Sequence, residues 1–597
     1  MILTHPLTSQ ATRLAALRTE LARLGVDGLL VPRADAFLGE YVPASAERLA
    51  WISGFTGSAG LALVLRDRAI LFIDGRYTTQ AAREADPALW ETRHLVDQPP
   101  ADLLKRDFPG ARIGYDPWLH PESQLDRLGA SGATLVPLPA NPIDAVWADR
   151  PVPPIAPPVP HPAAFAGVDA ATKRGDAAAL LRAAGQDAVV LADPHSVAWL
   201  LNMRGSDLSH TPLALACALL HADGTVELFL DPARADAALR AHLGNAVSLL
   251  PPAALPACLA GLSGRKVRVD ADVTPAWFAQ ALRAAGAIPE AGEDPCRLPR
   301  ACKNPVEQDG ARQAHARDAV ALVRFLAWFD RVVPAGGQTE MSAAAQLLAL
   351  RASGEHFVGE SFPAISGAGE HGAIIHYRAS PETDRAIHPG EAYLIDSGAQ
   401  YRDGTTDVTR TLFTGPSPAP EELAARFTRV LRGHLALSAL RFPEGIGGPH
   451  LDALARRPLW DAGLDYDHGT GHGVGSFLSV HEGPAGISRA ARPVPLAPGM
   501  ILSNEPGFYL PGAYGIRIEN LLMVRRAAAL PGQVKPFLDF ETLTLAPYDR
   551  RLILVAALSP AEIAQIDAYH ARVLAALEGR LPAEDAAWLR AACAKLA

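Results

Sequence analysis

The feature that most constrains the fold is an internal repeat in the first half of the chain. The segments "AERLAWISGFTGS" and "PHSVAWLLNMRGS" share Ala-Trp at 50–51 and 198–199 and Gly-Ser at 57–58 and 205–206, with equal internal spacing. A helix and a strand precede each segment. Chance similarity between two common helix–strand units is the alternative, but the matched spacing from Trp to Ser argues against it. We therefore predict two related α/β domains in succession.

The helices that precede the repeated segments are recognised by their apolar spacing. In the first copy, leucines recur at intervals of three, four and three residues, and the pattern stops at Gly25 before the strand-like "DGLLVP". The leucines of this stripe are Leu14, Leu17, Leu21 and Leu24. Residues 172–192 repeat the plan, with a helix that ends at Gly185 and the strand "DAVVLA".

Two boundaries divide the chain further. Residues 151–162, "PVPPIAPPVPHP", contain seven prolines, so this segment is predicted to be a stiff, extended linker that cannot join a sheet. Near residue 300, Asn304, Pro305 and Glu307 supply an N-cap, a first-turn proline and a capping-box acid for a long helix. From about residue 556 a helical tail is expected. The predicted domains are 1–150, 163–302, 303–555 and 556–597.

Charge and cysteine usage exclude several classes of protein. The net charge of −9 argues against a nucleic-acid-binding surface. The five cysteines are scattered without a C-x-x-C pair, which suits a reducing compartment. We find no secretory leader at the N-terminus and no run of about 18 apolar residues. We therefore expect a cytoplasmic protein that binds neither nucleic acid nor membrane.

The stretch "EAYLIDSGAQYRDGTTDVTR", residues 391–410, places Asp396 and Asp407 in an apolar setting. One reading is that these acids are turn residues, because "RDGT" is a strong turn signal. A two-residue turn at Asp403-Gly404 would pair Asp396 with Thr411, whereas a wider loop would place the two acids opposite each other. Like charges opposite one another repel, so two acids held together need a cation between them.

The third region contains further residues of this kind. "YDHGTGHGVGSFLSVHEGP" carries His468, His472 and His481, and Glu505 and Glu519 each adjoin an apolar run. Each residue alone is more often structural or solvated. Together with Asp396 and Asp407, however, the two glutamates make four carboxylates, whose charge two divalent cations would cancel. Two such ions a few ångströms apart can generate a nucleophile at neutral pH.

Competing motifs fail on inspection. "GTGHGVG" does not fit G-x-G-x-x-G, "HEGPA" departs from H-E-x-x-H, and neither a P-loop nor a G-x-S-x-G turn is found. The glycines are better explained by close approach of the backbone to the site. His472 and His481 are nine residues apart and would face opposite sides of a flat strand, so a turn or bulge must intervene if both reach a substrate.

Taken in order, "IIHY", "YLIDSGAQYRDGTTDVTRT", "HGTGHGVGSFLSVHEGP", "NEPGFY" and "GIRIEN" resemble the aminopeptidase P (X-prolyl aminopeptidase) family of the creatinase, prolidase and methionine aminopeptidase superfamily. The resemblance covers essentially the whole chain. It implies an α/β (α+β) protein with two creatinase-like N-terminal domains, a pita-bread catalytic domain and a C-terminal extension, as in the long cytosolic form.

The resemblance also implies roles for individual residues. Asp396 would ligate one metal, His472 and Glu505 the other, and Asp407 and Glu519 would bridge them. His376 and His481 match the two active-site histidines of the family, and Glu505 would relay a proton to the leaving nitrogen. The residues that match the lining of the substrate site are His468, Tyr509 and Arg517.

The implied reaction is release of the first residue from short peptides that have proline second, by attack of a hydroxide that bridges two metal ions. Manganese is the expected metal, with zinc or cobalt as alternatives. The enzymatic alternative is a prolidase acting on Xaa-Pro dipeptides, and the non-enzymatic one is a pseudo-peptidase that only binds. The family also suggests a homodimer through the catalytic domain. The tail with Trp588 either forms that interface or packs on its own domain.

Overall fold

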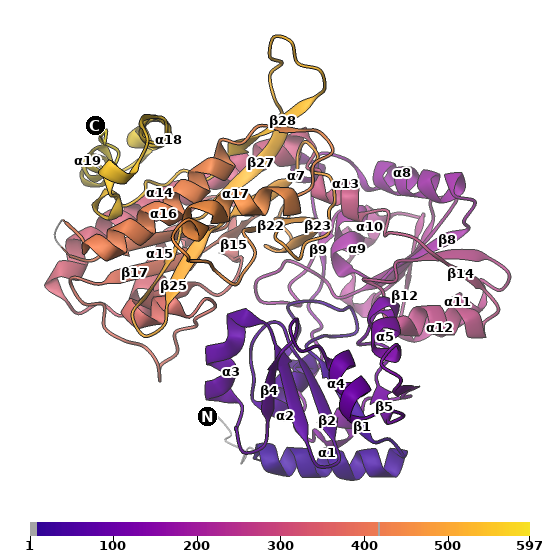
Figure 1. Cartoon of the computed structure of the whole chain (residues 1–597). Coiled ribbons are helices and arrows are strands. Elements are labelled where there is room, and N and C mark those ends of the chain that lie inside the picture. The colour runs from indigo at the N-terminus through magenta and orange to yellow at the C-terminus, as the bar shows by residue number, and fades with distance from the viewer. Residues whose placement is uncertain (1–8, 416–417, 597) are drawn as a thin grey trace. The chain divides into compact units, whose positions relative to one another are not determined.

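The computed structural model describes residues 9–415 and 418–596 and divides into two compact units. Figure 1 follows the chain from the N-terminus to the C-terminus by colour. Unit 1 contains the described residues up to His161, Asp169–Ser209 and Leu213–Cys296, and unit 2 contains Pro162–Val168, His210–Pro212 and the chain from Arg297 onward.

Unit 1 contains two six-stranded sheets with the same strand order. The first sheet runs β4-β3-β2-β1-β5-β6 and the second β12-β11-β10-β8-β13-β14. The first comprises β1 (Gly28–Pro32), β2 (Leu61–Leu65), β3 (Ala69–Ile73), β4 (Glu91–His94), β5 (Arg112–Tyr115) and β6 (Thr134–Pro137). The second comprises β8 (Ala188–Leu191), β10 (Cys217–His221), β11 (Val226–Phe229), β12 (Val247–Leu250), β13 (Lys266–Val269) and β14 (Ile288–Ala291).

Strand directions also agree between the two sheets. In the first sheet, β1 pairs antiparallel with β2 and parallel with β5. In the second sheet, β8 pairs antiparallel with β10 and parallel with β13 in the same way. The outer pairs β3–β4 and β11–β12 are parallel, as are β5–β6 and β13–β14. The prediction of two related α/β folds is confirmed.

The predicted helices open each half. Helix α1 (Gln10–Leu24) buries Leu14, Leu17 and Leu21 and ends at Gly25, whose φ of 69° a glycine adopts without strain. Helix α8 (Ala170–Ala183) is its counterpart and is followed by Gly185 with a φ of 67°. The matched tryptophans lie on α2 (Arg48–Ser53) and α9 (Pro194–Leu200). Further helices of unit 1 are α3 (Thr78–Glu84), α4 (Pro100–Asp107), α5 (Glu122–Gly129), α6 (Pro142–Val146), α10 (Ala237–Leu243), α11 (Leu255–Ala260) and α12 (Ala276–Ala284).

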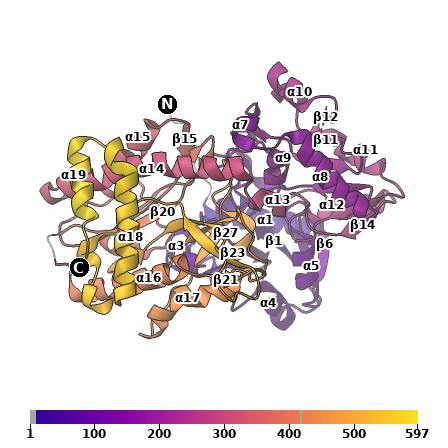
Figure 2. The same cartoon turned by 90° about the horizontal axis from the view of Figure 1, so that it is seen from above.

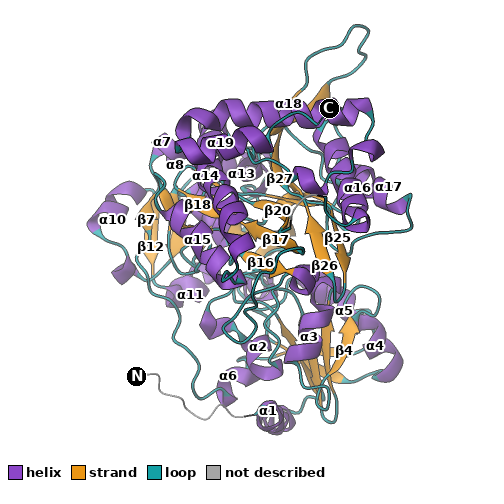
Figure 3. Ribbon diagram, turned by 90° about the vertical axis from the view of Figure 1, so that its left-hand side faces the viewer, coloured by secondary structure: helices purple, strands orange, loops and turns teal. Residues whose placement is uncertain are grey.

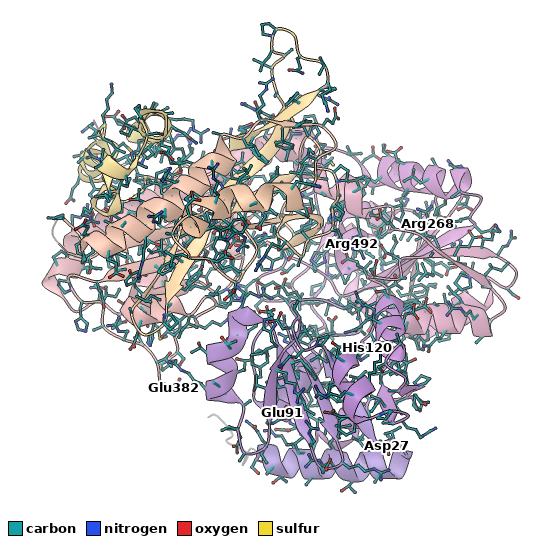
Figure 4. All side chains as sticks on the ribbon, viewed as in Figure 1. Asp27, Glu91, His120, Arg268, Glu382 and Arg492 are labelled. Carbon is teal, nitrogen blue, oxygen red and sulfur yellow. The ribbon has the colours of Figure 1, made fainter. Side chains whose placement is uncertain are left out.

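The two halves of unit 1 are bonded to each other. The Ala276 N–H donates to the carbonyl of His120 at 2.8 Å, and the Trp118 and Trp277 rings stack with centroids 4.1 Å apart. His120 is labelled in Figure 4. These contacts explain why the two sheets form one compact unit.

The prediction for the proline-rich linker was wrong in one respect. Val159–Pro160 forms a short strand, β7, that pairs antiparallel with β9 (Met203–Arg204). A proline can sit at an edge where only its carbonyl is needed, and here the neighbouring His161 N–H donates to the Asn202 carbonyl at 2.7 Å.

Unit 2 is built from antiparallel strands covered by helices. Its sheets have the orders β16-β17-β20, β15-β18-β19, β21-β28-β27-β24-β22-β23 and β25-β26. The strands are β15 (Phe357–Glu360), β16 (Ile365–Ala368), β17 (Ala392–Ser397), β18 (Ala399–Tyr401), β19 (Gly404–Thr405), β20 (Val408–Phe413), β21 (Phe442–Pro443), β22 (Gly471–Gly473), β23 (Glu482–Ile487), β24 (Ile501–Asn504), β25 (Gly507–Leu510), β26 (Tyr514–Arg517), β27 (Asn520–Arg526) and β28 (Phe537–Thr542).

Helices cover the sheets of unit 2 in two groups, as Figure 3 shows. Helices α14 (Pro305–Val332) and α15 (Glu340–Ala352) share a core with β17 and β20 that includes Phe325, Leu347 and Tyr393. Helices α16 (Glu421–Ser438) and α17 (Pro449–Trp460) pack on the strands that follow them in the chain. The short helices α7 (Ala163–Ala166) and α13 (Arg297–Ala301) also belong to this unit.

Helix α14 begins as predicted. The Asn304 side chain accepts from the backbone N–H groups of Val306 and Glu307, and the Glu307 carboxylate accepts from the Asn304 N–H, which completes a capping box. The helix buries Leu322, Val323 and Leu326 in unit 2.

The predicted C-terminal helices are α18 (Pro560–Leu577) and α19 (Ala583–Ala592). They lie side by side in Figure 2, and both contact α14. Trp588 Nε1 donates to Asp330 of α14 at 2.8 Å, and Leu589 is fully buried. The tail therefore packs on its own unit. Among the described helices, none is long and apolar enough to cross a membrane.

Candidate metal centre

The hairpin that carries the first two acids has a register that differs from both sequence alternatives. Asp396 pairs with Thr409, and the two-residue turn lies at Arg402-Asp403 because Tyr401 pairs with Gly404. Gly404 is a strand residue here because β19 lies against α14, where a Cβ on Gly404 would be 3.0 Å from the Ala314 methyl group. Asp407 is two residues before Thr409, so the two carboxylates are diagonal neighbours on one face of the hairpin.

The remaining acids come from the other sheet. Glu505 directly follows β24 and Glu519 directly precedes β27, and these strands pair through Asn504 and Asn520. One ligand atom each from Asp407, His472 and Glu519 lie within 4.8 Å of one another. The His472 Nε2 is 3.5 Å from Asp407 Oδ2 and 3.5 Å from Glu505 Oε1. The structure thus brings these four residues together from both sheets.

The position of the proton on the His472 ring indicates that the cluster binds a metal ion. Its Nδ1 lies 3.0 Å from the Gly473 carbonyl, which can only accept, so Nδ1 carries the proton. In the neutral ring, Nε2 then presents a lone pair toward two carboxylate oxygens, an arrangement of acceptors that a bound cation would stabilise. A histidine oriented by its other nitrogen in this way is the usual form of a metal ligand.

Unsatisfied oxygen atoms support the same conclusion. Asp396 Oδ1 and Asp407 Oδ1 are buried and accept no hydrogen bond from the residues that the structure describes. Asp396 and Asp407 are only 8% and 4% exposed, so solvent does not compensate for this lack. Four carboxylates and one imidazole with inward-facing lone pairs fit two divalent cations in charge and in ligand chemistry.

Electrostatics without cations would force protons onto the site. Burial, followed by the charges of Glu519 and Asp396, holds the pKa of Asp407 well above its usual range. Burial and Asp396 do the same for the pKa of Glu519. The pKa of Glu505 rises to about 7, chiefly through burial, although Arg517 opposes the rise. Bound cations would reverse these shifts because they favour the charged carboxylates.

Two hydroxyl groups that the sequence did not single out orient the glutamates. Thr409 Oγ1 donates to Glu519 Oε2 at 2.7 Å. Ser503 Oγ accepts from the His472 N–H at 2.9 Å and donates to Glu505 Oε1 at 3.1 Å. The bonds of Thr409 to Glu519 and of His472 to Ser503 cross between strands, so the sequence contains no signal for these roles beyond the position of the hydroxyls near the acids.

The predicted substrate residues form a hydrogen-bonded chain that ends on Asp396. Arg517 donates to Asp396 Oδ2 and to the Tyr509 hydroxyl, both at 2.7 Å, and the Tyr509 hydroxyl lies 2.8 Å from His468 Nε2. His468 Nδ1 donates to the Gly469 carbonyl, so its Nε2 accepts the Tyr509 proton. Burial raises the pKa of Tyr509 to about 12, which keeps this donor protonated.

His472 and His481 approach each other as the sequence required. Their ring centroids are 4.3 Å apart, and a loop between β22 and β23 and a register shift at His472–Gly473 separate them along the chain. Phe477 within this loop has a φ of 49°. An electrostatic interaction with His481 also opposes the rise in the pKa of Glu505.

The glycines around His472 allow close backbone contacts. A Cβ on Gly471 would lie 1.9 Å from the Ser503 carbonyl oxygen, and one on Gly473 would lie 2.1 Å from the Glu482 carbonyl oxygen. No side chain fits at either position, so these glycines let β22 lie against both neighbouring strands.

His376 lies in a turn that follows the 3₁₀ helix η6 (Gly369–Ala373) and is half-buried. This segment contacts the strand that carries Arg517, because a Cβ on Gly515 would lie 1.7 Å from the Gly372 carbonyl oxygen. The role of His376 at the metal centre stays a prediction. The loop continues past Glu382, which is labelled in Figure 4.

The sequence matches known families along most of its length. Residues 309–526 match metallopeptidase family M24, and residues 536–596 match the C-terminal region of peptidase M24. Residues 13–146 and 149–307 each match a creatinase/prolidase N-terminal domain.

Full-length relatives have similar sequences. The chain is 36% identical to Aminopeptidase P1 of Lotus japonicus, over 97% of this chain and 98% of that protein. It is 37% identical to a probable Xaa-Pro aminopeptidase P of Tuber melanosporum over the same shares. Among solved structures, X-prolyl aminopeptidase from Caenorhabditis elegans, described as a cytosolic enzyme with a di-nuclear active site, superposes with a TM-score of 0.93 at 33% identity and covers 99% of this chain and 100% of its own.

Proposed function

Because the chain belongs to the aminopeptidase P family of M24 metallopeptidases, we propose that the carboxylate–histidine cluster is the metal centre of its peptidase reaction. The protein is a hydrolase that releases the N-terminal residue from peptides with proline in the second position. The observation that carries the site assignment is the lone pair of His472 Nε2 facing two carboxylate oxygens at 3.5 Å.

The site takes two divalent metal ions. We propose that Asp396, Asp407, His472, Glu505 and Glu519 hold them. When bound, the ions would lower the pKa of a water molecule and polarise the scissile carbonyl. We propose manganese as the native metal because oxygen ligands dominate, with zinc and cobalt as the alternatives.

Residues of the chain then move protons and hold the substrate. Glu505 takes the proton of the attacking water at a carboxylate oxygen as the new C–O bond forms, and then passes it to the proline nitrogen, which leaves as the C–N bond breaks and the carbonyl is restored. His481, whose ring centroid lies 4.3 Å from that of His472, donates to the carbonyl oxygen, which gains negative charge as the reaction proceeds. His376 is assigned to the same task.

Substrate binding is assigned to the chain of His468, Tyr509 and Arg517. The bond from Arg517 fixes one oxygen of Asp396, which leaves the other oxygen of that carboxylate facing the centre. Proline has no N–H and a fixed φ, so a pocket shaped for its ring distinguishes this reaction from general aminopeptidase activity.

We also propose the four-part division at 1–150, 163–302, 303–555 and 556–597, a cytoplasmic location and a homodimer through the catalytic domain. The two similar sheets of unit 1 support the first two divisions. Trp588 packs within its own unit and so gives no support to a dimer contact through this side chain. The loop between β27 and β28 projects in Figure 1 and exposes Leu530 and Val534, which supports a contact there. Light scattering of the wild-type protein and a Val534→Asp variant tests this proposal.

The decisive experiment strips metal with a chelator, restores manganese and follows three peptides by mass spectrometry. Metal-dependent release of the first residue from an Xaa-Pro-Xaa tripeptide, with no cleavage of Xaa-Ala-Xaa, is the expected result. Cleavage of an Xaa-Pro dipeptide alone would instead indicate a prolidase, and binding of metal without any cleavage would indicate a pseudo-peptidase.

A further inference from the structure

The two glutamates of the metal centre are flanked by asparagines in mirror order. Asn504 precedes Glu505, Asn520 follows Glu519, and the two asparagines are opposite each other on β24 and β27. Successive side chains in an extended segment point to opposite faces. The asparagine side chains therefore point away from the carboxylates, toward helix α16.

A single buried histidine on α16 contacts both asparagines. His434 is fully buried, with its Nδ1 3.1 Å from the Asn504 carbonyl oxygen and its Nε2 3.1 Å from Asn520 Nδ2. Asn504 Nδ2 returns a hydrogen bond to the His434 carbonyl at 2.9 Å. His434 therefore contacts the residue that precedes Glu505 and the residue that follows Glu519.

The direction of each hydrogen bond in this network follows from one cation. The guanidinium of Arg410 can only donate, and it bonds Asn520 Oδ1 at 2.8 Å. The amide of Asn520 must then turn its Nδ2 toward His434, so His434 Nε2 accepts. Its Nδ1 therefore carries the proton, which it donates to Asn504. The His434 ring, the Asn520 amide and the Arg410 guanidinium thus have consistent donor and acceptor roles.

This arrangement is stable to pH. Burial, then the charge of Arg410, lowers the pKa of His434 to about 3, so the ring stays neutral where a peptidase works. A neutral imidazole offers one donor and one acceptor, which is what the two asparagines require.

We propose that His434 is a positioning residue that sets the spacing of Glu505 and Glu519 and thereby the affinity of the centre for divalent metal. It touches neither substrate nor ligand, but it fixes the backbone of one strand and the side chain of the other, directly beside each glutamate. This inference rests on the proposed function of the site.

The test compares metal retention in three variants of the full chain. His434→Leu keeps a similar volume and removes both hydrogen bonds, His434→Gln keeps one donor and one acceptor on adjacent atoms, and Leu431→Ala is a matched control. Leu431 is fully buried on the same helix, so its loss weakens packing without touching either asparagine. Bound manganese is measured by mass spectrometry across a series of chelator concentrations, alongside thermal stability.

We expect His434→Leu to lower manganese affinity by about 10- to 100-fold, as for other residues that orient metal ligands. His434→Gln should recover part of the loss, and Leu431→Ala should lose thermal stability but retain metal. Retention by His434→Leu at the wild-type level, or equal metal loss in Leu431→Ala, would overturn the proposal. If His434→Leu does not fold, the other two variants decide. The proposal is then overturned if His434→Gln retains metal at the wild-type level while Leu431→Ala loses metal. Failure of the wild-type protein to bind manganese, zinc or cobalt would overturn the proposed function instead.

Discussion

Two buried acidic clusters adjoin the hairpin from β17 to β20, and they differ in how their charge is balanced. Asp318, 4% exposed, accepts two hydrogen bonds from Arg351, at 2.8 and 3.0 Å, and one from the Tyr401 hydroxyl at 3.0 Å. In the metal centre, no lysine or arginine of the described residues forms an ion pair with Asp407 or Glu519.

The difference teaches that burial of acids does not by itself identify a functional site. The Asp318 cluster is complete, so it stabilises the fold without any added ion. The metal centre has carboxylate oxygens without donors, so it is complete only with cations. Balance of charge therefore separates a structural cluster from a metal-binding one.

The largest expected contrast comes from matched substitutions in the two clusters. Asp407→Asn should abolish turnover and leave the metal-free fold at least as stable as wild type, because it removes a repelling charge. Asp318→Asn should lower the free energy of unfolding by about 3–5 kcal/mol, because Arg351 loses its ionic partner in the interior. Urea unfolding in chelator and peptide hydrolysis with manganese measure both effects. Equal destabilisation by the two substitutions would contradict the comparison.

Removal of metal should lower stability through the metal centre and not through the Asp318 cluster. Manganese at about 100 times its dissociation constant should stabilise the wild-type protein by about 2.7 kcal/mol relative to the chelated protein. Asp407→Asn should lose most of this increment, whereas a conservative substitution near Asp318, such as Tyr401→Phe, should retain it. Thermal melting with and without manganese provides the measurement, and a metal effect that survives Asp407→Asn would count against the site.

Dependence on pH follows from the raised pKa of Glu505. A carboxyl whose pKa is higher in the folded state binds more protons folded than unfolded, so the stability it contributes is lost as pH rises. For Glu505 the window runs from the ordinary glutamate pKa of 4.5 to about 7. Metal-free protein should therefore lose stability across this window, and Glu505→Gln should reduce the loss without abolishing it, because Asp407 and Glu519, whose pKa values are also raised, remain. A metal-free profile that rises from pH 5 to 7 in wild type and not in Glu505→Gln would contradict the sign.

The smallest predicted effect concerns the hydrogen-bonded chain on Asp396. Tyr509→Phe removes the hydroxyl that joins Arg517 to His468, and a typical hydrogen bond contributes about 1 kcal/mol. We expect kcat/KM for the proline tripeptide to fall about fivefold, with metal content unchanged. The metal content of the variant, measured beside its kinetics, separates this effect from damage to the metal ligands. Loss of metal would show that the hydrogen-bonded chain is needed to hold the metal ions.

Much of the fold could be predicted from local pattern. The leucine stripe of α1, the capping box of α14 and the repeated Trp-to-Ser spacing each depend on neighbours in sequence, and each prediction is confirmed. The hairpin register could not be predicted, because Gly404 serves the contact of β19 with α14 rather than the turn. The short pairing of Val159–Pro160 with β9 is likewise a tertiary contact.

For the site, the sequence singled out residues with charge or a reactive ring but not those that orient them. His434 and Arg410 look in sequence like ordinary residues of a helix and a strand. Their importance follows from partners far away in the chain, such as Asn504 and Asn520. Orientation of ligands is thus the part of the site that requires three dimensions.

The bonds of Arg410 also have a consequence for the order in which the protein is made. This guanidinium donates to the Ala546 and Pro547 carbonyls and to the Tyr569 hydroxyl on α18, as well as to the Glu519 carbonyl. Helix α18 leaves the ribosome after every acid and histidine of the metal centre. While the nascent chain grows, Arg410 therefore lacks part of its hydrogen bonding, and the strand that carries Glu519 gains its full support only when α18 has docked.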